Sequence, residues 1–181
     1  MEMNEKKIKK KIVLEGAYED IIELNDHYYL VSKKQRICVL PYTISSQGLL
    51  DRIGVVKDLN ILTENYDYTL INGYISEDDN TNLVAANRLL YEIIGSNIKD
   101  ADLWMYLGTI SSYLTSDSEI RLYCVNISEV PIKESKSVKD EEEAKRFQML
   151  DCSKVVTSND MIFLSGYLRL FNFFYVNSLS K

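Results

Sequence analysis

The sequence is poor in several residue types that carry chemistry or interrupt regular structure. It has 2 proline, 7 glycine, 1 histidine and 3 cysteine residues in a chain of 181. The single histidine, His27, cannot form a His-based metal cluster on its own. The cysteines Cys38, Cys124 and Cys152 are odd in number and lack CxxC spacing, which indicates buried reduced thiols in a reducing compartment. No apolar run reaches about 18 residues, so no transmembrane helix is expected.

Acidic residues outnumber basic ones, and this imbalance limits the expected partners. The chain carries 21 Lys and Arg against 27 Asp and Glu, for a formal net charge of −6. Nucleic acid and anionic membranes would repel a negative protein, so neither is an expected partner. The sequence also contains no GxSxG, GxGxxG or GxxxxGK(S/T) motif. This argues against a serine hydrolase and against the common phosphate-binding loops.

The remaining composition is typical of a globular protein. The chain is 46% apolar and 27% charged, and at this length a single domain can bury about two-thirds of its unfolded surface. We expect a basic N-terminal arm over residues 1–11 and one domain over residues 12–181. The sequence is rich in Asn, Ile and Lys, which is typical of AT-rich bacterial or phage genomes. A location in the cytoplasm or within a phage particle is therefore expected.

Short strand-like runs dominate the first 75 residues. They are rich in β-branched and aromatic residues and are separated by turn residues such as Asn25–Asp26. Pro41 is expected near the end of one such run, where proline is tolerated. The predicted strands are Ile12–Ala17, Asp20–Leu24, Tyr28–Val31, Arg36–Tyr42, Leu49–Val56, Asn60–Thr63 and Tyr66–Ile71.

A hairpin and a polar insertion are predicted further along the chain. Leu103–Leu114 and Glu119–Ile127 have strand composition, and they flank the turn Thr115–Ser118. Residues 132–146, IKESKSVKDEEEAKR, are charged and are expected to form either a flexible loop or a short exposed helix. Phe147–Val156 then has the composition of another strand.

A final helix of about 16 residues is predicted within residues 159–177. It follows the N-cap cluster Ser158–Asn159–Asp160. Phe173 and Phe174 lie off the main apolar line, so the helix is apolar on more than one side and is either deeply packed or meets a partner. We expect a protein partner or a second copy to contact Phe171, Phe174 and Tyr175. The apolar positions with helical spacing are Met161, Leu164, Leu168, Phe171 and Tyr175.

The stretch from Asn72 to Gly95, NGYISEDDNTNLVAANRLLYEIIG, contains the clearest helix signal. Asp79, Asn80 and Thr81 can each cap a helix N-terminus with a side-chain oxygen. Apolar residues then recur at intervals of three and four, and Gly95 can supply the left-handed residue that ends many helices. Together with the runs on either side, this order of elements indicates an α+β fold with a mostly β core.

The segment from Gly73 to Gly95 resembles the Nudix box, the glycine–loop–helix signature of Nudix hydrolases. The family's motif is a glycine, five residues, a glutamate, seven residues and then R-E-apolar-x-E-E-x-G. With Gly95 as the last glycine, Arg88 matches the arginine and Glu92 matches the first of the paired glutamates. Gly73 and Asp79 keep the five-residue gap, with aspartate in place of glutamate and one extra residue before Arg88.

The sequence on either side of this segment extends the resemblance. QRICVLPYTISSQGLLDRIG is similar to the family's strands before the box, and LWMYLGTISSYLTSDSEIRLYCVNI resembles the hairpin after it. The resemblance covers about residues 10–175 and is nearest in layout to the ADP-ribose pyrophosphatase-like branch. It implies a mixed β-sheet core flanked by the Nudix-box helix and a C-terminal helix.

The box departs from the family at positions that matter for chemistry. Nudix hydrolases split a nucleoside diphosphate linked to another group, with water attacking a phosphorus atom held by magnesium. The resemblance implies that carboxylates at the positions of Leu89, Glu92 and Ile93 bind this metal. Residues one helical turn apart share a face, so the leucine and the isoleucine remove two of three anionic ligands.

Three functional hypotheses follow from these departures. The leading one is a catalytically inactive Nudix-fold protein, without a metal cofactor, that serves as a binding or structural subunit of a larger assembly. In it, Arg88 pairs with Glu77, Asp78 or Asp79 and locks the loop onto the helix. The alternative is a divergent hydrolase of a compound such as ADP-ribose, in which Glu92 and one of those acids hold Mg²⁺ or Mn²⁺. The third retains a nucleotide ligand without hydrolysis.

Overall fold

The described elements are two sheets, three α-helices and one 3-10 helix, taken from a computed structural model. The structure describes residues 10–24, 26–60, 64–111, 119–132, 146–155, 158 and 160–179. In chain order the elements are β1 (Lys10–Glu15), β2 (Glu19–Leu24), β3 (His27–Ser32), β4 (Arg36–Ile44), β5 (Leu50–Asn60), β6 (Asn65–Thr69), β7 (Ile71–Tyr74), α1 (Asn82–Ile94), the 3-10 helix η1 (Ala101–Leu103), β8 (Trp104–Ser111), β9 (Glu119–Asn126), β10 (Arg146–Asp151), α2 (Cys152–Val155) and α3 (Met161–Leu179).

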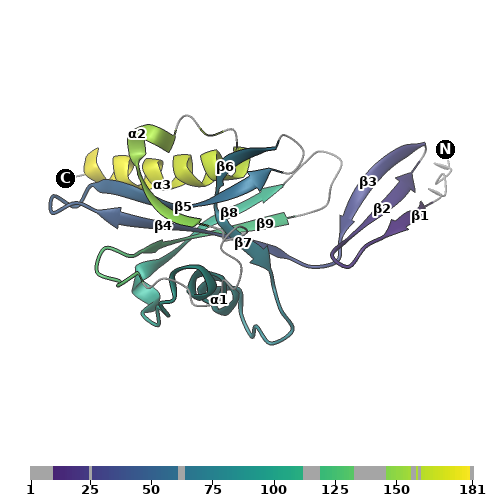
Figure 1. The fold of residues 1–181 in the computed structure, drawn as a ribbon, viewed down its shortest axis with the longest axis horizontal. Coiled ribbons are helices and arrows are strands. Elements are labelled where there is room, and N and C mark those ends of the chain that lie inside the picture. Colours follow the sequence, from purple (N-terminus) through teal and green to yellow (C-terminus); the bar gives the residue numbers. More distant parts are fainter. Residues whose placement is uncertain are drawn as a thin grey trace, which may run out of the picture.

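A mixed sheet of seven strands forms the body of the protein (Figure 1). Its main path runs β10-β5-β4-β9-β8, with β6 beside β5 and β7 beside β4. All neighbours are antiparallel except β4 and β9, which run parallel. The strands β1, β2 and β3 form a separate antiparallel sheet that projects to one side of the body (Figure 1). We call this three-stranded unit the small sheet.

Helices cover both faces of the large sheet, and each face has its own core. On one face α3 packs over residues such as Leu40 and Leu122, while on the other α1 packs over Val39 and Val125. Figure 1 shows the two helices on opposite sides of the strands. Strand β4 is therefore buried on both faces, which explains why its sequence is a continuous apolar run rather than an alternation.

The α+β class predicted from the sequence is confirmed, as is the strand-rich first part of the chain. The hairpin of β2 and β3 forms as expected, with Asp26 at φ 64° in its turn. The turn Thr115–Ser118, residues 1–9 of the basic arm and residues 133–145 of the polar insertion lie outside the described residues. Within the described ranges, no helix is long and apolar enough to cross a membrane.

Three predicted boundaries are wrong, each because tertiary contacts decide where a strand ends. Strand β4 continues past Pro41, which lies where the neighbour on one side changes from β7 to β5. Strand β5 extends to Asn60, so no new strand begins there, and residues 61–63 lie outside the described part. Strand β10 ends at Asp151 with its pairing to β5, and the short helix α2 follows.

Helix α3 is apolar on two sides. The side that packs against the large sheet is not the predicted line of apolar residues but the side that carries Phe163 and Leu170. Phe163 and Leu170 are fully buried against the large sheet, and Asp160 caps the helix by accepting from the backbone N–H groups of Ile162 and Phe163. Phe174 also faces inward, because it is half-buried and packs edge-on against Tyr42 at 5.6 Å. Phe174 therefore packs against the core, and its role on an interaction surface stays a prediction.

The opposite side of α3 carries apolar side chains into solvent. Four members of the predicted apolar line are exposed there: Met161, Leu168, Phe171 and Tyr175. The rings of Phe171 and Tyr175 stack with centroids 6.3 Å apart. We call these four residues the outer face of α3. The predicted line of apolar residues thus forms, for the most part, a solvent-facing surface.

A leucine-to-alanine substitution should affect the free energy of unfolding differently on the two sides of α3. Leu170 is 0% exposed and Leu168 is 61% exposed. We expect Leu170→Ala to lower the free energy of unfolding by about 2–5 kcal/mol, because it leaves a cavity. The matched variant Leu168→Ala should change it by no more than about 0.5 kcal/mol. Urea unfolding followed by circular dichroism measures both, and equal losses would contradict this orientation of α3.

Candidate functional site

Hydrogen bonds fix both ends of α1. Thr81 caps the helix, since its Oγ1 accepts from the backbone N–H of Val84 at 3.2 Å. Gly95 ends the helix at φ 67°, and its N–H donates to the carbonyl of Tyr91 at 2.8 Å. Both ends of the helix were predicted, because each depends on a few neighbouring residues.

Gly73 allows α1 to approach strand β7 closely. A Cβ atom added at this position would overlap the side chain of Leu89. Leu89 is 6% exposed and belongs to the core between α1 and the sheet. The position that the family resemblance assigns to a metal-binding glutamate is therefore filled here by a packed apolar side chain.

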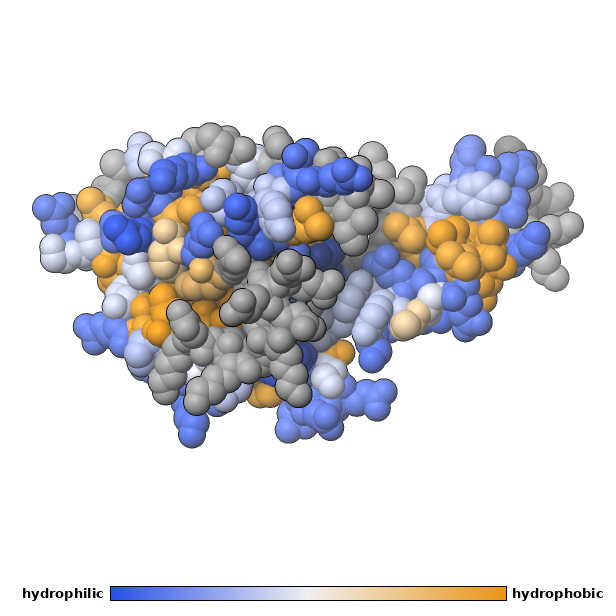
Figure 2. Space-filling view, viewed as in Figure 1, coloured by the Kyte–Doolittle hydropathy of each residue, from blue (hydrophilic) through white to orange (hydrophobic). Residues whose placement is uncertain are grey.

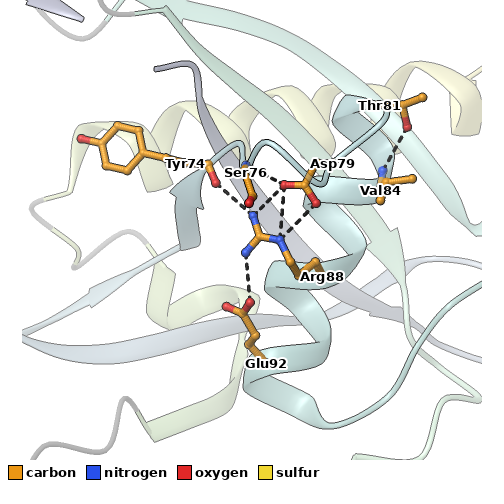
Figure 3. A network of polar contacts seen from close by, with 7 residues as sticks. All are labelled: Tyr74, Ser76, Asp79, Thr81, Val84, Arg88 and Glu92. Carbon is orange, nitrogen blue, oxygen red and sulfur yellow. Dashed lines mark hydrogen bonds and ion pairs between the residues drawn. The ribbon is translucent and has the colours of Figure 1, made fainter. Parts of the chain in front are cut away.

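Arg88 is the centre of the polar contacts at this site (Figure 3). Its Nε and Nη2 donate to the two carboxylate oxygens of Asp79, at 3.1 and 2.8 Å. Nη2 also donates to the carbonyl of Tyr74 at 3.0 Å, and Nη1 donates to Oε1 of Glu92 at 2.9 Å. One guanidinium thus joins the loop, strand β7 and helix α1.

Asp79 is held by more than its bond to Arg88. Its Oδ2 accepts from the backbone N–H of Ser76 at 2.8 Å, and its own N–H donates to the carbonyl of Ser76. Its side chain is only 3% exposed. The hydrogen bonds from Arg88 hold the pKa of the Asp79 carboxyl below its ordinary value. The same bonds raise the pKa of Arg88, so both groups stay charged.

Glu92 is the more exposed of the two acids that contact Arg88. Its side chain is 52% exposed, and its contact with Arg88 is an i, i+4 pair along one face of the helix. Exposed pairs of this kind contribute about 0.3–0.5 kcal/mol. The carboxylate of Glu92 therefore remains accessible at the surface.

A small pocket of about 250 Å³ lies between strands β5 and β7 and helix α1. Glu92 is its one acidic residue, and its polar amide is Asn72. The Asn72 amide is already hydrogen-bonded within the protein. Its Oδ1 accepts from Arg36 at 2.9 Å, and its Nδ2 donates to the carbonyl of Leu70 at 3.0 Å. The lining residues are Val56, Leu70, Ile71, Asn72, Leu89, Glu92 and Ile93.

The described residues contain no cluster of three metal-ligating side chains. Magnesium takes oxygen ligands in near-octahedral geometry. In the part of the chain that the structure describes, no three Asp, Glu, His or Cys side chains are grouped closely enough to hold a metal ion. Asp79 is turned onto Arg88, while Leu89 and Ile93 are among the apolar residues packed at the core and the pocket.

The structure brings together part of the predicted site and separates the rest. Gly73, Asp79, Arg88, Glu92 and Gly95 lie in one unit. Of the three acids considered as partners of Arg88, Asp79 forms the pair, while Glu77 and Asp78 are exposed on the loop. Phe171 and Tyr175 lie on α3, across the large sheet.

Sequence reasoning missed two participants, the carbonyl of Tyr74 and the N–H of Ser76. Both are backbone groups, and every residue carries them. Their role depends on how the loop folds, so no pattern of side chains could have revealed it.

The Asp79–Arg88 pair makes stability depend on acid pH. Because the folded-state pKa of Asp79 lies below 3.8, its contribution is present above that pH and is lost as pH falls through the folded-state value. At neutral pH we expect Asp79→Asn to lower the free energy of unfolding by about 2 kcal/mol. This difference from the wild type should shrink below pH 3.8 in urea titrations.

Glu92→Gln is the matched control, because it also removes a carboxylate that contacts Arg88 but from an exposed position. We expect this variant to lose no more than about 0.5 kcal/mol. Equal losses for the two variants, or a difference for Asp79→Asn that persists in acid, would contradict this account.

Comparison with known proteins identifies the fold by structure and not by sequence. No protein-family model and no curated protein sequence matches the chain. Among solved structures, the chain is similar to an ADP compounds hydrolase, with a TM-score of 0.65 and 14% identity over 93% of each chain.

Two further solved structures support the same likeness. The Nudix domain of Shewanella oneidensis NrtR, solved with ADP ribose, has a TM-score of 0.57 and 16% identity, over 77% of this chain and 88% of its own. A Nudix hydrolase described as putative, from Listeria monocytogenes, has a TM-score of 0.56 and 12% identity, over 80% of this chain and 97% of its own. Likeness at this level of identity establishes architecture, and the chain therefore has the Nudix fold.

Proposed function

We propose that this chain is a Nudix-fold protein without hydrolase activity, which serves as a binding or structural subunit of a larger assembly. The observation that carries the proposal is the apolar packing of the family's metal positions. Leu89 is buried against Gly73, and Ile93 packs beside it at the pocket. A hard divalent cation needs several oxygen ligands, and Glu92 alone supplies too few of them.

The polar residues that remain are engaged with one another. Arg88 is bound to Asp79, Glu92 and the carbonyl of Tyr74. Asp79 is turned away from solvent. If Asp79 moved to a metal, the guanidinium would lose its paired bond and the carboxylate would lose the N–H of Ser76. This arrangement supports a structural role for the charges.

The size of the pocket supports the same conclusion. Pockets that enclose a small-molecule ligand usually have volumes of roughly 300–1,000 Å³. The pocket beside α1 has about 250 Å³, and its amide is already bonded within the protein. A nucleoside diphosphate would find little room and few free polar groups there.

The outer face of α3 supports a role in binding another protein. Aromatic and large apolar side chains are enriched in the centres of protein interfaces. Leu168, Phe171 and Tyr175 are exposed along one side of α3, and the side chains that hold the helix to the sheet lie on its other side. This face can therefore be covered without any change to the core.

An activity assay tests the loss of hydrolysis. We expect no turnover of ADP-ribose, NADH or nucleoside triphosphates with Mg²⁺ or Mn²⁺, measured by phosphate release and chromatography of products. Glu92→Gln should leave this background unchanged. Turnover that the wild type shows and Glu92→Gln abolishes would instead establish a divergent, metal-dependent hydrolase. A rise in Tm on addition of ADP-ribose, without turnover, would favour a nucleotide-binding role.

A surface variant tests the binding role. We expect Leu168→Ser/Phe171→Ser to keep the wild-type Tm within a few degrees, because both side chains face solvent. Proteins that co-purify with the wild-type chain from its own host should be lost with this variant. The matched control is Leu59→Ser/Tyr66→Ser, which changes exposed residues on β5 and β6 instead. Equal recovery with both variants would contradict a role for α3.

A further inference from the structure

Helix α3 carries an apolar pattern that its packing on the large sheet does not use. The predicted apolar line recurs at intervals of three and four residues, an average of about 3.5. Helices with this spacing pair side by side as coiled coils, because it keeps one apolar seam facing the partner. The side chains that are buried against the sheet, Phe163 and Leu170, lie off this line. The line consists of Met161, Leu164, Leu168, Phe171 and Tyr175.

Most of this line is accessible to a partner. Figure 1 shows α3 as an outer layer on the large sheet. Met161 and Leu168 are 73% and 61% exposed, and Phe171 and Tyr175 are about half exposed. Leu164 is partly buried against the core. Figure 2 shows that hydrophobic surface is also exposed on the small sheet, so exposure alone does not single out α3. Its spacing does, and that spacing indicates that the partner is another helix.

The charges around the line favour a second copy of the chain as that partner. Helix α3 contains one charged residue, Arg169. Its guanidinium is held against β8, where Nη1 and Nη2 donate to the carbonyls of Leu107 and Thr109 at 2.9 and 3.1 Å. Charges that flank such a seam select the partner, and here the flanking residues, Ser165 and Asn172, are uncharged. Homodimer interfaces are also more apolar than those of other complexes.

We propose that two copies of the chain associate through α3, with the helices antiparallel and a two-fold axis between Leu168 and Phe171. This arrangement places Leu168 opposite the partner's Phe171, and Leu164 opposite the partner's Tyr175, so each layer joins a leucine to an aromatic ring. A parallel pair would instead put two leucines in one layer and two aromatic rings in the next, which packs less evenly. Antiparallel helices also set their dipoles in opposite directions, which is favourable.

The exposed area of the line indicates a weak dimer. Phe171 and Tyr175 each expose roughly 100 Å², about half of what an aromatic side chain can bury. With Met161 and Leu168 they bring the interface to roughly 1,000 Å² over both copies, which is near the lower limit for a specific complex. Such a dimer dissociates on dilution, so unfolding of dilute samples compares Leu168 with Leu170 in single chains.

Size-exclusion chromatography with light scattering tests the dimer on the full chain. We expect the wild-type mass to rise with concentration to at least twice the 20.9 kDa of one chain. Leu168→Asp should halve this mass at the same concentration, because it buries an acid in the apolar seam. Since Leu168 is exposed in the single chain, this variant should keep the wild-type circular dichroism spectrum.

Leu59→Asp is the matched control, because it changes an exposed leucine of β5 in the same way. It should keep the wild-type mass. A wild type that stays monomeric at every concentration, or a mass that Leu168→Asp leaves unchanged, overturns the proposal.

A charge pair tests the antiparallel orientation without removing an apolar residue. Ser165 and Asn172 flank the line on one side, and antiparallel pairing brings Ser165 near the partner's Asn172. At low salt, Ser165→Glu/Asn172→Lys should lower the dimer dissociation constant and Ser165→Glu/Asn172→Glu should raise it, with a difference of roughly tenfold. If the two variants dissociate alike, the helices do not pair antiparallel.

The inference rests on the proposed binding role of α3 and names its partner. The two can fail separately. A monomeric wild type that binds host proteins, and loses them in Leu168→Ser/Phe171→Ser, would keep the binding role and overturn the dimer. Hydrolysis of ADP-ribose by a chain whose mass Leu168→Asp halves would overturn the proposed lack of activity and keep the dimer.

Discussion

The bond between Arg88 and Asp79 fixes the geometry on which the rest of the site depends. A carboxylate as buried as Asp79 is tolerated only with a cation and further hydrogen bonds. Arg88 supplies the cation, and the N–H of Ser76 supplies another donor. Because Arg88 also binds the carbonyl of Tyr74, the loop cannot move without exposing unpaired groups. The loop, strand β7 and helix α1 are thus held together by contacts within the protein.

Leu89 and Ile93 lie beside this bond on α1, at positions where the family resemblance places carboxylates. Carboxylates one helical turn apart repel each other and destabilise a helix that has no cation to bind them. A buried leucine contributes about 1.5–3 kcal/mol relative to an exposed one. In this chain Leu89 fills the space against Gly73, so the helix packs on the strand through an apolar contact. This apolar contact favours the folded state.

Helix α1 could be predicted because residues next to its ends determine where it begins and ends. Elements whose position depends on contacts with residues far away in the sequence were harder to predict. Thr81 and Gly95 act on the turns next to them, so both helix ends could be read from a few residues. Phe163 is buried and Met161 is exposed because of how α3 lies on strands far away in the sequence. Since both sides of that helix are apolar, its sequence alone could not show which side is buried. The pairing of Arg88 with Asp79 was one of three options, and loop geometry decided it. The fold was therefore more predictable than its surfaces.

The parallel pairing of β4 with β9 also has a consequence for the order in which the protein folds. Strand β4 is synthesised before β9, which pairs with it along seven residues. Contacts between distant parts of a chain form slowly, because a long loop must close first. Until then the most apolar strand has only β5 and β7 beside it. The nascent chain is therefore most vulnerable to aggregation before its second half is complete.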